Sequence, residues 1–414
     1  MTTAAEFASP PAEPPTSGHT RALATVWFTL FLDLVSFGIV IPVLPFYAKS
    51  TGASEGLIAL LATAYSAAQF VMSPVLGRLS DRHGRRPVML ISIFGSTMAM
   101  LTLGFAQALW MLFLSRTISG VCNANVSTAH AYVADRVPPH QRARYMGMMG
   151  TAVGLGFIVG PSLGGLLARA DWPQFPFFVG AALSLLNFLM AVLWLPESHR
   201  PRAAAVAGPP PPRPSLLTVA RDPAFRRSQI GVMVAVYFSF FCAFAAMEAT
   251  FALFAEACFG WGEQENGRYF AFIGTVIVLF QGFIVGRAVS TIGERRSLAL
   301  GLTLSFTGFL LLCASPSWLF VVLGGFFIAG GNGLIMPSMS ALVSRNSTSE
   351  NQGINAGFAQ SAGALGRIAG PMIAGVLFEV IGPRAPMASS ATLVVLVCLM
   401  VLARVHESRP EAGR

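Results

Sequence analysis

Four ionisable side chains lie inside long apolar stretches of the sequence: Asp33, Arg116, Glu248 and Arg367. A charge at the centre of a membrane-spanning helix costs about 3 kcal/mol on insertion scales, so such residues usually pair with one another or serve a function. Two are acidic and two are basic, and we expect Asp33 to pair with Arg116 and Glu248 with Arg367. A carboxyl group in such a setting can also bind and release a proton. All four are therefore candidates for proton coupling, with static structural pairs as the alternative.

The composition predicts a membrane protein rather than a soluble one. The chain has 414 residues, of which 54% are hydrophobic and only 11% are charged. A soluble domain carries about 25% charged residues, so too few charges are present to cover this much apolar material with a polar surface. We therefore predict an all-α membrane protein and exclude a water-soluble enzyme.

Apolar runs of helical length predict twelve transmembrane helices. Between the sixth and the seventh, residues 196–227 contain Pro209 to Pro212 and many arginines, which is typical of a cytoplasmic linker. We expect a disordered cytoplasmic tail at 1–21, a six-helix bundle at 22–195, a second at 228–405 and a cytoplasmic tail at 406–414. The expected spans are 22–48, 57–79, 88–107, 110–135, 143–169, 174–195, 228–258, 266–289, 297–314, 317–341, 351–379 and 385–405.

The basic residues predict the orientation. Most of the 27 Lys and Arg residues lie at the chain ends and in even-numbered loops, and the odd-numbered loops contain only Lys49, Arg169, Arg268 and Arg384. The positive-inside rule then places both termini in the cytoplasm of a cell membrane. The net charge of +9 is not clustered in one domain, so nucleic acid is not an expected partner. The five cysteines are scattered without a Cys/His cluster, and we expect no disulfides, metal or other cofactor.

Short motifs occur twice in the chain. Gly77-Arg78 returns 209 residues later as Gly286-Arg287, and Gly160-Pro161 returns 210 residues later as Gly370-Pro371. Duplicated halves are typical of carriers that rock around a binding site near the membrane midplane. We therefore predict two pseudo-symmetric six-helix bundles around a small-molecule substrate.

The segment between the second and third spans, GRLSDRHGRRP at 77–87, is rich in charge and glycine. A glycine permits close helix approach, and Asp81 can cap a helix or pair with Arg85. An ordinary positively charged turn is the alternative. The full pattern resembles the loop signature of the major facilitator superfamily, which implies a cytoplasmic gate loop with the residues Gly77, Asp81, Arg82, Gly84, Arg85 and Arg86.

Two helices carry unusual residues on a predicted face. The fifth contains GLGFIVGPSLGG at 154–165, and glycines at this density suit helices that bend or slide past each other. In the fourth, polar residues follow one narrow stripe, which should face an aqueous cavity. His130 lies on this stripe near the cytoplasmic end, where simple packing is the alternative to a proton role. The expected cavity residues are Asn123, Ser127 and, in the eleventh helix, Gln360.

Together these motifs resemble the twelve-helix drug–proton antiporters of the major facilitator superfamily, above all the tetracycline-resistance exporters. The resemblance also includes Asp33 with Pro42 to Pro45, Arg116 with Gly120, 131–135 and 293–296. It implies a transporter, not an enzyme, that exports a small amphipathic drug or metabolite in exchange for protons by alternating access. We also expect a monomer in a bacterial inner membrane. The residues of the antiporter motif are Gly156, Gly160, Pro161, Gly164 and Gly165.

Some residues depart from the family pattern. Asn123 and Asn125 stand where small residues are favoured, and Arg367 adds a positive charge that the antiporter motif does not require. An organic-anion or nutrient carrier on the same fold, working as a uniporter or symporter, is therefore the alternative. A channel or receptor would need a selectivity constriction or a ligand-sensing domain. A membrane enzyme would need a metal-spaced His set, a nucleophile elbow or a phosphate loop, and the sequence has none of these.

Overall fold

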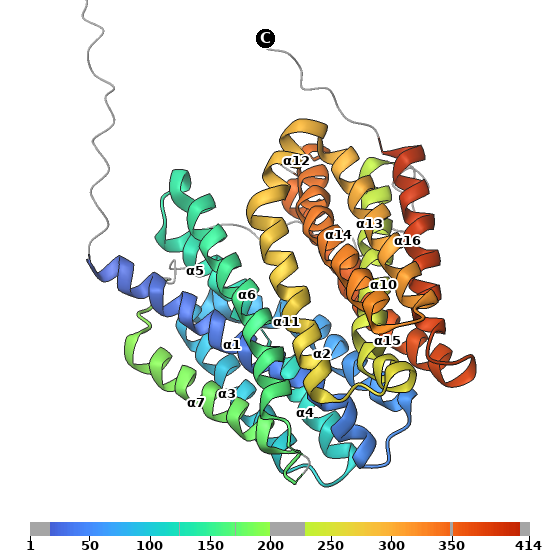
Figure 1. The fold of residues 1–414 in the computed structure, drawn as a ribbon. Helices are drawn as coiled ribbons and strands as arrows, with labels where there is room; N and C mark the ends of the chain where they lie inside the picture. Colours follow the sequence, from blue (N-terminus) through green and yellow to red (C-terminus); the bar gives the residue numbers. More distant parts are fainter. Residues whose placement is uncertain (1–16, 124, 170, 199–227, 348–350, 406–414) are drawn as a thin grey trace, which may run out of the picture.

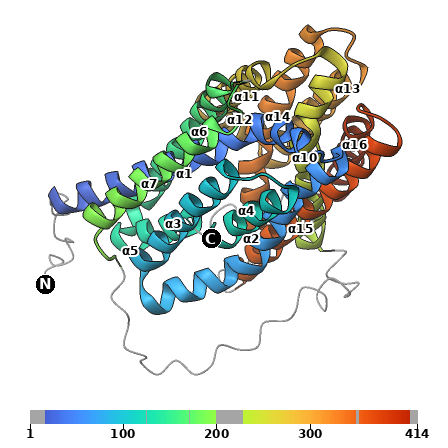
Figure 2. The same cartoon turned by 90° about the horizontal axis from the view of Figure 1, so that it is seen from below.

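The computed structural model describes residues 17–123, 125–169, 171–198, 228–347 and 351–405. Within these ranges the secondary structure is helical and contains no strand. The expected tails at 1–21 and 406–414 and the expected linker lie almost entirely outside the described residues. The helices form two groups that lie side by side (Figures 1 and 2).

The first half contains the helices that precede the linker. Its α1 runs from Ser17 to Ser50, and a turn at Gly52 leads into α2. The remaining helices are α2 (Glu55–His83), α3 (Arg85–Gly104), α4 (Leu109–Cys122), α5 (Asn125–Arg136), α6 (Pro139–Leu167) and α7 (Phe175–Trp194).

The second half follows the linker with the same pattern of long helices. A π-helical segment at Phe280–Ile284 interrupts its second span, between α11 and α12. The helices are α10 (Gln229–Phe259), α11 (Glu263–Leu279), α12 (Val285–Ile292), α13 (Glu294–Ala314), α14 (Trp318–Arg345), α15 (Gln352–Val380) and α16 (Ala385–Arg404).

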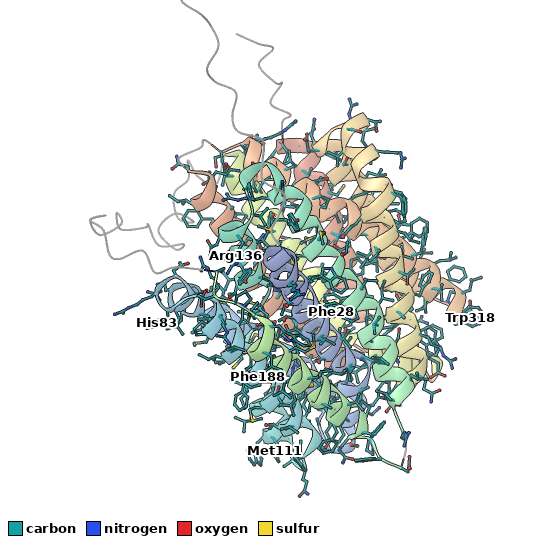
Figure 3. The ribbon with its side chains drawn as sticks, turned by 90° about the vertical axis from the view of Figure 1, so that its left-hand side faces the viewer. Phe28, His83, Met111, Arg136, Phe188 and Trp318 are labelled. Carbon is teal, nitrogen blue, oxygen red and sulfur yellow. The ribbon has the colours of Figure 1, made fainter. Side chains whose placement is uncertain are left out.

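Within the described ranges, eleven helical segments are long and apolar enough to cross a membrane. The expected fourth span, 110–135, is not one continuous helix but is divided into α4 and α5. The first of these ends at Cys122, and the next residue, Asn123, has a φ of −80° and a ψ of 81°, which lie outside the helical region. Large apolar side chains remain exposed on the outside of the bundle, such as Phe28 at 48% and Trp318 at 60% (Figure 3). Such a surface suits lipid and confirms a multi-pass membrane protein.

The two halves pack alike. In the first half α1 packs on α6 and α7, and α3 packs on α4 and α7; in the second half α10 packs on α15 and α16, and α13 packs on α14 and α16. The halves meet mainly where α6 crosses α11 and where α15 crosses α2. These equivalent contacts confirm two pseudo-symmetric bundles.

A pair of glycines lies where α6 crosses α11, and another lies where α15 crosses α2. These two pairs, here called the glycine crossings, allow the halves to approach closely. A Cβ added to Gly267 of α11 would lie 2.7 Å from Gly165 Cα of α6. A Cβ added to Gly375 of α15 would lie 3.0 Å from Gly56 Cα of α2. Because these neighbours are main-chain atoms, any larger residue would have to push two helices apart.

Polar contacts join the halves at the same end of the molecule. Lys49 Nζ lies 2.9 Å from a carboxylate oxygen of Glu256, and the Gly56 N–H donates to Glu379 Oε1 at 2.9 Å. We call this end, marked by Lys49, Gly56, Glu256 and Glu379, the closed end.

At the opposite end, which we call the open end, lie Gly77 and Gly286. A Cβ added to either glycine would meet nothing within 4 Å. Among the described residues, the ion pairs at this end stay inside one half, such as Glu294 with Arg345 at 2.7 Å. Figure 1 shows the two groups together below and diverging upward, where α5 and α12 lie.

Candidate functional site

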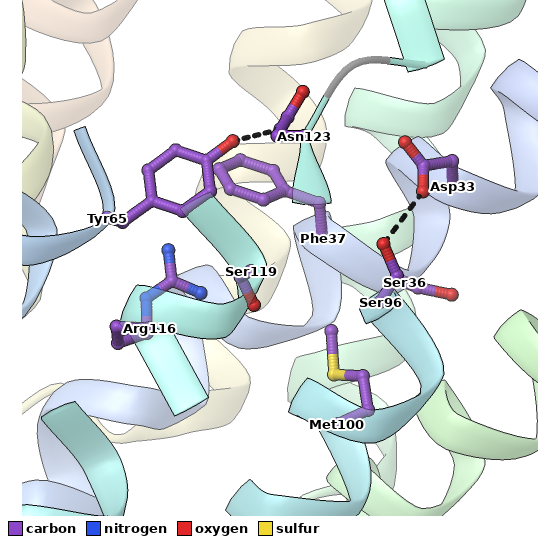
Figure 4. A pocket seen from close by; sticks show the side chains of 9 residues that line it. All are labelled: Asp33, Ser36, Phe37, Tyr65, Ser96, Met100, Arg116, Ser119 and Asn123. Atoms are coloured by element: carbon purple, nitrogen blue, oxygen red, sulfur yellow. Dashed lines mark hydrogen bonds between the residues drawn. The ribbon is translucent and has the colours of Figure 1, made fainter. Parts of the chain in front are cut away.

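A pocket in the first half brings α1, α2, α3 and α4 together (Figure 4). Polar and charged side chains from all four helices face it, which is unusual inside a membrane protein and marks a functional site. Its lining consists of Asp33, Ser36, Phe37, Tyr65, Ser96, Met100, Arg116, Ser119 and Asn123.

Asp33 is half-buried in this pocket. The Ser96 hydroxyl donates to Asp33 Oδ1 at 3.3 Å, and the buried Asn125 side chain is a second polar neighbour of the carboxyl group. Among the described residues, Asp33 forms no ion pair, so the expected pair with Arg116 is wrong. The two side chains lie on opposite sides of the pocket in Figure 4.

Arg116 is held by aromatic rings instead. It is only 5% exposed, and its guanidinium carbon lies 4.7 Å from the centre of the Tyr65 ring and 5.8 Å from that of Phe37. A guanidinium stacked on a ring gains a cation–π attraction that is strongest where water is excluded. This stacking explains how the charge is kept near the pocket without a carboxylate in contact.

Glu248 on α10 and Arg367 on α15 bring charge from the second half. Both are partly buried, and the charge of Glu248 interacts with Arg367 and with Arg116. The described side chains form no close ion pair between Glu248 and Arg367, so this expected pair is present only as a longer-range interaction. Arg367 stacks on the Phe241 ring, with 4.7 Å from guanidinium carbon to ring centre.

Tyr65 was not expected from the sequence, although it is central to this arrangement. The Asn123 amide donates a hydrogen bond to the Tyr65 hydroxyl, which interacts electrostatically with Arg116 and Arg367. Two residues away, the Thr63 hydroxyl donates to the Ile368 carbonyl at 3.3 Å and ties α2 to α15. A polar aromatic residue in an apolar helix was the available signal.

The expected cavity residues do not all meet. Asn123 lines the pocket, whereas Ser127, Gln360 and also His130 are exposed outside its lining. The predicted stripe assumed a continuous helix, and the break at Asn123 changes the direction that later residues of α5 face. The roles of these residues in transport stay predictions.

The gate-loop segment ends α2 and begins α3. Gly84 has a φ of 103°, which glycine adopts without strain. The Arg85 guanidinium pairs with Asp81 at 2.5 Å, as expected, and also with Asp135 of α5 at 3.0 Å. The main-chain N–H groups of Arg85 and Arg86 donate to Glu197 at 2.9 and 3.2 Å, so Glu197, which was not expected, caps α3. Gly77 and Arg82 are exposed.

The glycines of the antiporter motif are packing positions. A Cβ added to Gly156 would lie 2.4 Å from Leu34 Cβ. A Cβ added to Gly160 would lie 2.7 Å from the Val35 carbonyl oxygen, and one added to Gly164 would lie 2.5 Å from the Ile39 carbonyl oxygen. These three therefore hold α6 against α1, and Pro161 lies inside the same helix. Only Gly165, at a glycine crossing, faces the second half.

Comparisons with known proteins agree with this fold. The family model described as Major Facilitator Superfamily matches residues 26–288 and 259–414. The chain is 34% identical to the tetracycline resistance protein of class G from Vibrio anguillarum, over 82% of this chain and 86% of that protein. It is 31% identical to the class B protein from Escherichia coli, over 84% and 86% respectively.

The fold is also found among solved structures. The human organic anion transporter MFSD10 (TETRAN) superposes with a TM-score of 0.71 at 24% identity, covering 94% of this chain and 100% of that one. The resemblance in the motifs is thus confirmed over most of the chain. The protein is therefore a membrane transporter, not an enzyme, and it belongs to the Major Facilitator Superfamily, in the family that includes the tetracycline resistance proteins.

Proposed function

We propose that the protein exports a small amphipathic drug or metabolite from a bacterial cell in exchange for protons. It acts as a monomer in the inner membrane, with both termini in the cytoplasm. Relatives at 31–34% identity are named for resistance to tetracycline, and a membrane transporter that gives drug resistance acts by removing the drug. Tetracycline is accordingly the first compound to test.

Alternating access is the proposed mechanism, with the bundles 22–195 and 228–405 rocking around the sites that contain Asp33 and Arg367. The contacts between the halves at the closed end, and the lack of equivalent contacts among the described residues of the open end, support this mechanism. The open end carries the even-numbered, arginine-rich loops, which the positive-inside rule assigns to the cytoplasm. The conformation described here would then receive substrate from the cytoplasm.

Asp33 is the proposed proton carrier, and its setting is the observation that carries the proposal. The carboxyl group faces the pocket, accepts from Ser96 and has no ion-pair partner among the described residues. A carboxyl group without a fixed counter-ion can gain or lose a proton when the facing side changes. One proton entering down a potential of 100 mV supplies roughly 2.3 kcal/mol, enough for more than a tenfold gradient of a neutral substrate.

The test uses purified protein in liposomes that are acidic inside and contain a trapped pH dye. Added tetracycline should discharge the gradient in vesicles with the protein, and should discharge it more slowly in empty vesicles. We expect Asp33→Asn to abolish this discharge while the protein is still inserted. The matched control is Asp171→Asn, which removes the same charge from an exposed loop.

Two outcomes contradict the proposal. Full proton movement in Asp33→Asn removes Asp33 from the mechanism. Solute equilibration without any proton movement would make the protein a uniporter, which is the alternative retained from the sequence.

A further inference from the structure

The arginine of each repeated Gly-Arg pair bonds to its own helix in the same way. Arg78 Nε donates to the Pro74 carbonyl at 3.2 Å, and Arg287 Nη1 donates to the Phe283 carbonyl at 2.8 Å. The offset of 209 that relates Arg78 to Arg287 also relates Pro74 to Phe283. The same contact between a guanidinium and a main-chain carbonyl thus occurs at the same position in both halves.

Both carbonyls lie at an interruption of a helix. In the first half, Pro74 lies inside α2, and a proline there provides no N–H for the carbonyl four residues earlier and clashes with it. In the second half, the π-helical segment at Phe280–Ile284 interrupts the regular α-helical hydrogen bonds. Sharp bends in helices occur mainly at interruptions of these two kinds. Two different local causes therefore allow the second span of each half to bend at the same place.

In the second half, the chain is held firmly up to the interruption. The Phe280 ring lies against α14, since a Cβ added to Gly330 would lie 2.8 Å from it. The same ring contacts Phe326 edge to face, with 5.7 Å between the ring centres. Just before it, Val278 touches the first half, because a Cβ added to Gly154 of α6 would lie 2.8 Å from Val278 Cγ2. α11 is thus fixed by both halves as far as the π-helical segment.

Beyond the π-helical segment, the surroundings are open. Phe283 is 64% exposed, and a Cβ added to Gly282 or Gly286 would meet nothing within 4 Å. The same holds for Gly147 and Gly150 of α6, the helix on which α11 packs. α12 packs on α13 and α14 of its own half. The interruption therefore lies where the close contact between the halves ends.

The first half follows the same pattern. Before Pro74, α2 is in close contact with α4, since a Cβ added to Gly120 would lie 3.1 Å from Gln69 N. After Pro74, the buried Leu76 packs with Val88 of α3, inside its own half. In both halves, a firmly packed stretch is therefore followed by an interruption and then by an end that packs on its own half.

We infer that residues 75–83 of α2 and 285–292 of α12 are hinged end segments, and that Arg78 and Arg287 are the positioning residues that hold their present bend. This inference goes beyond the proposed function, because it concerns how the open end moves and not what is carried. Rocking alone would move each half as a rigid body. The hinges let the open end close partly through bending of these two segments.

The size of the movement follows from the length of the segment. α12 has 8 residues, which makes it about 12 Å long at 1.5 Å per residue. A change of about 20° in the bend, the lower limit for a sharp kink, would move the end of α12 by about 4 Å. Distances within one half report this movement, since rigid-body rocking leaves them unchanged.

The test measures distances between spin labels inside one half, in purified full-length protein whose five native cysteines are replaced. One label pair joins Thr291→Cys of α12 to Arg404→Cys of α16. The other joins His83→Cys of α2 to Trp194→Cys of α7. All four positions are exposed. Electron–electron distance measurements need neither a substrate nor a proton gradient.

Removal of the guanidinium donors should release the end segments. Arg287→Met keeps a long side chain without any N–H group, and it should add a population shifted by about 4 Å between positions 291 and 404. Arg287→Lys should restore the original distribution, because its ammonium group can donate to the same carbonyl. Arg268→Met, at an exposed position of α11 before the interruption, is the matched control and should change nothing.

In the first half, Pro74→Ala tests whether the arginine acts through the interruption. Arg78→Met alone should broaden the distribution between positions 83 and 194. Pro74→Ala restores a main-chain N–H to α2 and should make this distribution narrower. Adding Arg78→Met to Pro74→Ala should then produce no broadening, because an uninterrupted helix has no bend for the arginine to hold.

The inference is overturned if Arg287→Met and Arg78→Met leave both distributions unchanged. It is also overturned if Arg78→Met broadens the distribution equally with and without Pro74. The restored distribution in Arg287→Lys and the narrower one in Pro74→Ala exclude a general loss of folding as the cause. Unchanged distances would refute the hinges and leave the proposed export untouched, whereas a failed liposome assay would leave the hinges standing.

Discussion

Replacing Gly267 by Ala should open the closed end of the molecule. The new Cβ would lie 2.7 Å from Gly165 Cα, 2.8 Å from the Pro161 carbonyl oxygen and 3.0 Å from the Gly165 nitrogen. All three are main-chain atoms and cannot turn away. Carbon atoms normally approach to about 3.5–4.0 Å, so α6 and α11 would have to separate by about 1 Å.

The size of this effect follows from the cost of overpacking. Forcing an extra methyl group into a close contact costs about 1–3 kcal/mol, and the contact exists only while the halves meet at the closed end. The cost therefore falls on this conformation alone and shifts the equilibrium toward the opposite one by about 5- to 150-fold. Gly375→Ala should act in the same direction but less, because its Cβ would meet Gly56 Cα and Ala59 Cβ at 3.0 Å.

A distance across the open end reports this shift. Spin labels at His83→Cys of α2 and Thr291→Cys of α12, both exposed, would be introduced into protein whose five native cysteines are replaced. Electron–electron distance measurements should show a larger short-distance fraction in Gly267→Ala than in the unmodified background. Gly282→Ala on the same span is the control, since an added Cβ there would meet nothing within 4 Å.

The short-distance fraction should be largest in Gly267→Ala and smaller in Gly375→Ala. In Gly282→Ala it should equal that of the unmodified background. Equal distributions in all three variants would show that the glycine crossings do not hold this conformation. A lower midpoint of thermal unfolding with no change in distance would mean that the strain acts inside a half instead.

Two further predictions concern contacts at the two ends. Lys49→Glu places a like charge next to Glu256 and should favour the opposite conformation by less than about 1 kcal/mol, because the two side chains are 47% and 31% exposed. The double variant that exchanges Lys49 and Glu256 should restore the original spin-label distances. Added salt should reduce the difference between Lys49→Glu and the unmodified protein. Gly84→Ala would place a Cβ 2.5 Å from Glu197 Oε2 at a φ of 103°, at a cost of about 1–3 kcal/mol. Thermal unfolding should show this loss, and a smaller one when Glu197 is already Ala; equal losses would exclude the contact as the cause.

Much of the fold could be predicted from the sequence because the membrane restricts the choice of structure. Apolar runs must become helices in lipid, since only a helix satisfies its own main-chain groups there. The repeated Gly160-Pro161 and Gly370-Pro371 revealed the duplication. The division of the fourth span at Asn123 could not be foreseen, because Asn123 lies in a run that is polar on one side and otherwise helical in pattern.

The site was less predictable, because charge counting does not determine which groups meet. The predicted pair of Asp33 with Arg116 relied on their opposite charges and on their similar depth in the membrane. Each is instead stabilised by a neutral neighbour: Ser96 for the carboxylate and Tyr65 for the guanidinium. A hydroxyl or a ring satisfies a charged group without leaving any charge pattern in the sequence. Glu197 was missed for a similar reason, since it caps α3 through main-chain N–H groups.

The two halves repeat their glycines but not all of their charges. Both glycine crossings join the halves in equivalent places, whereas Arg367, which follows Gly366, corresponds to Phe157, which follows Gly156. The contacts that the proposed rocking motion would form and break are therefore duplicated. The charge of Arg367 has no such duplicate, because Phe157 is neutral. A substitution at a crossing should thus change which end is open, and a substitution at Arg367 should change which compound is carried. Measuring both properties on both kinds of variant would separate the moving framework from the chemistry of recognition.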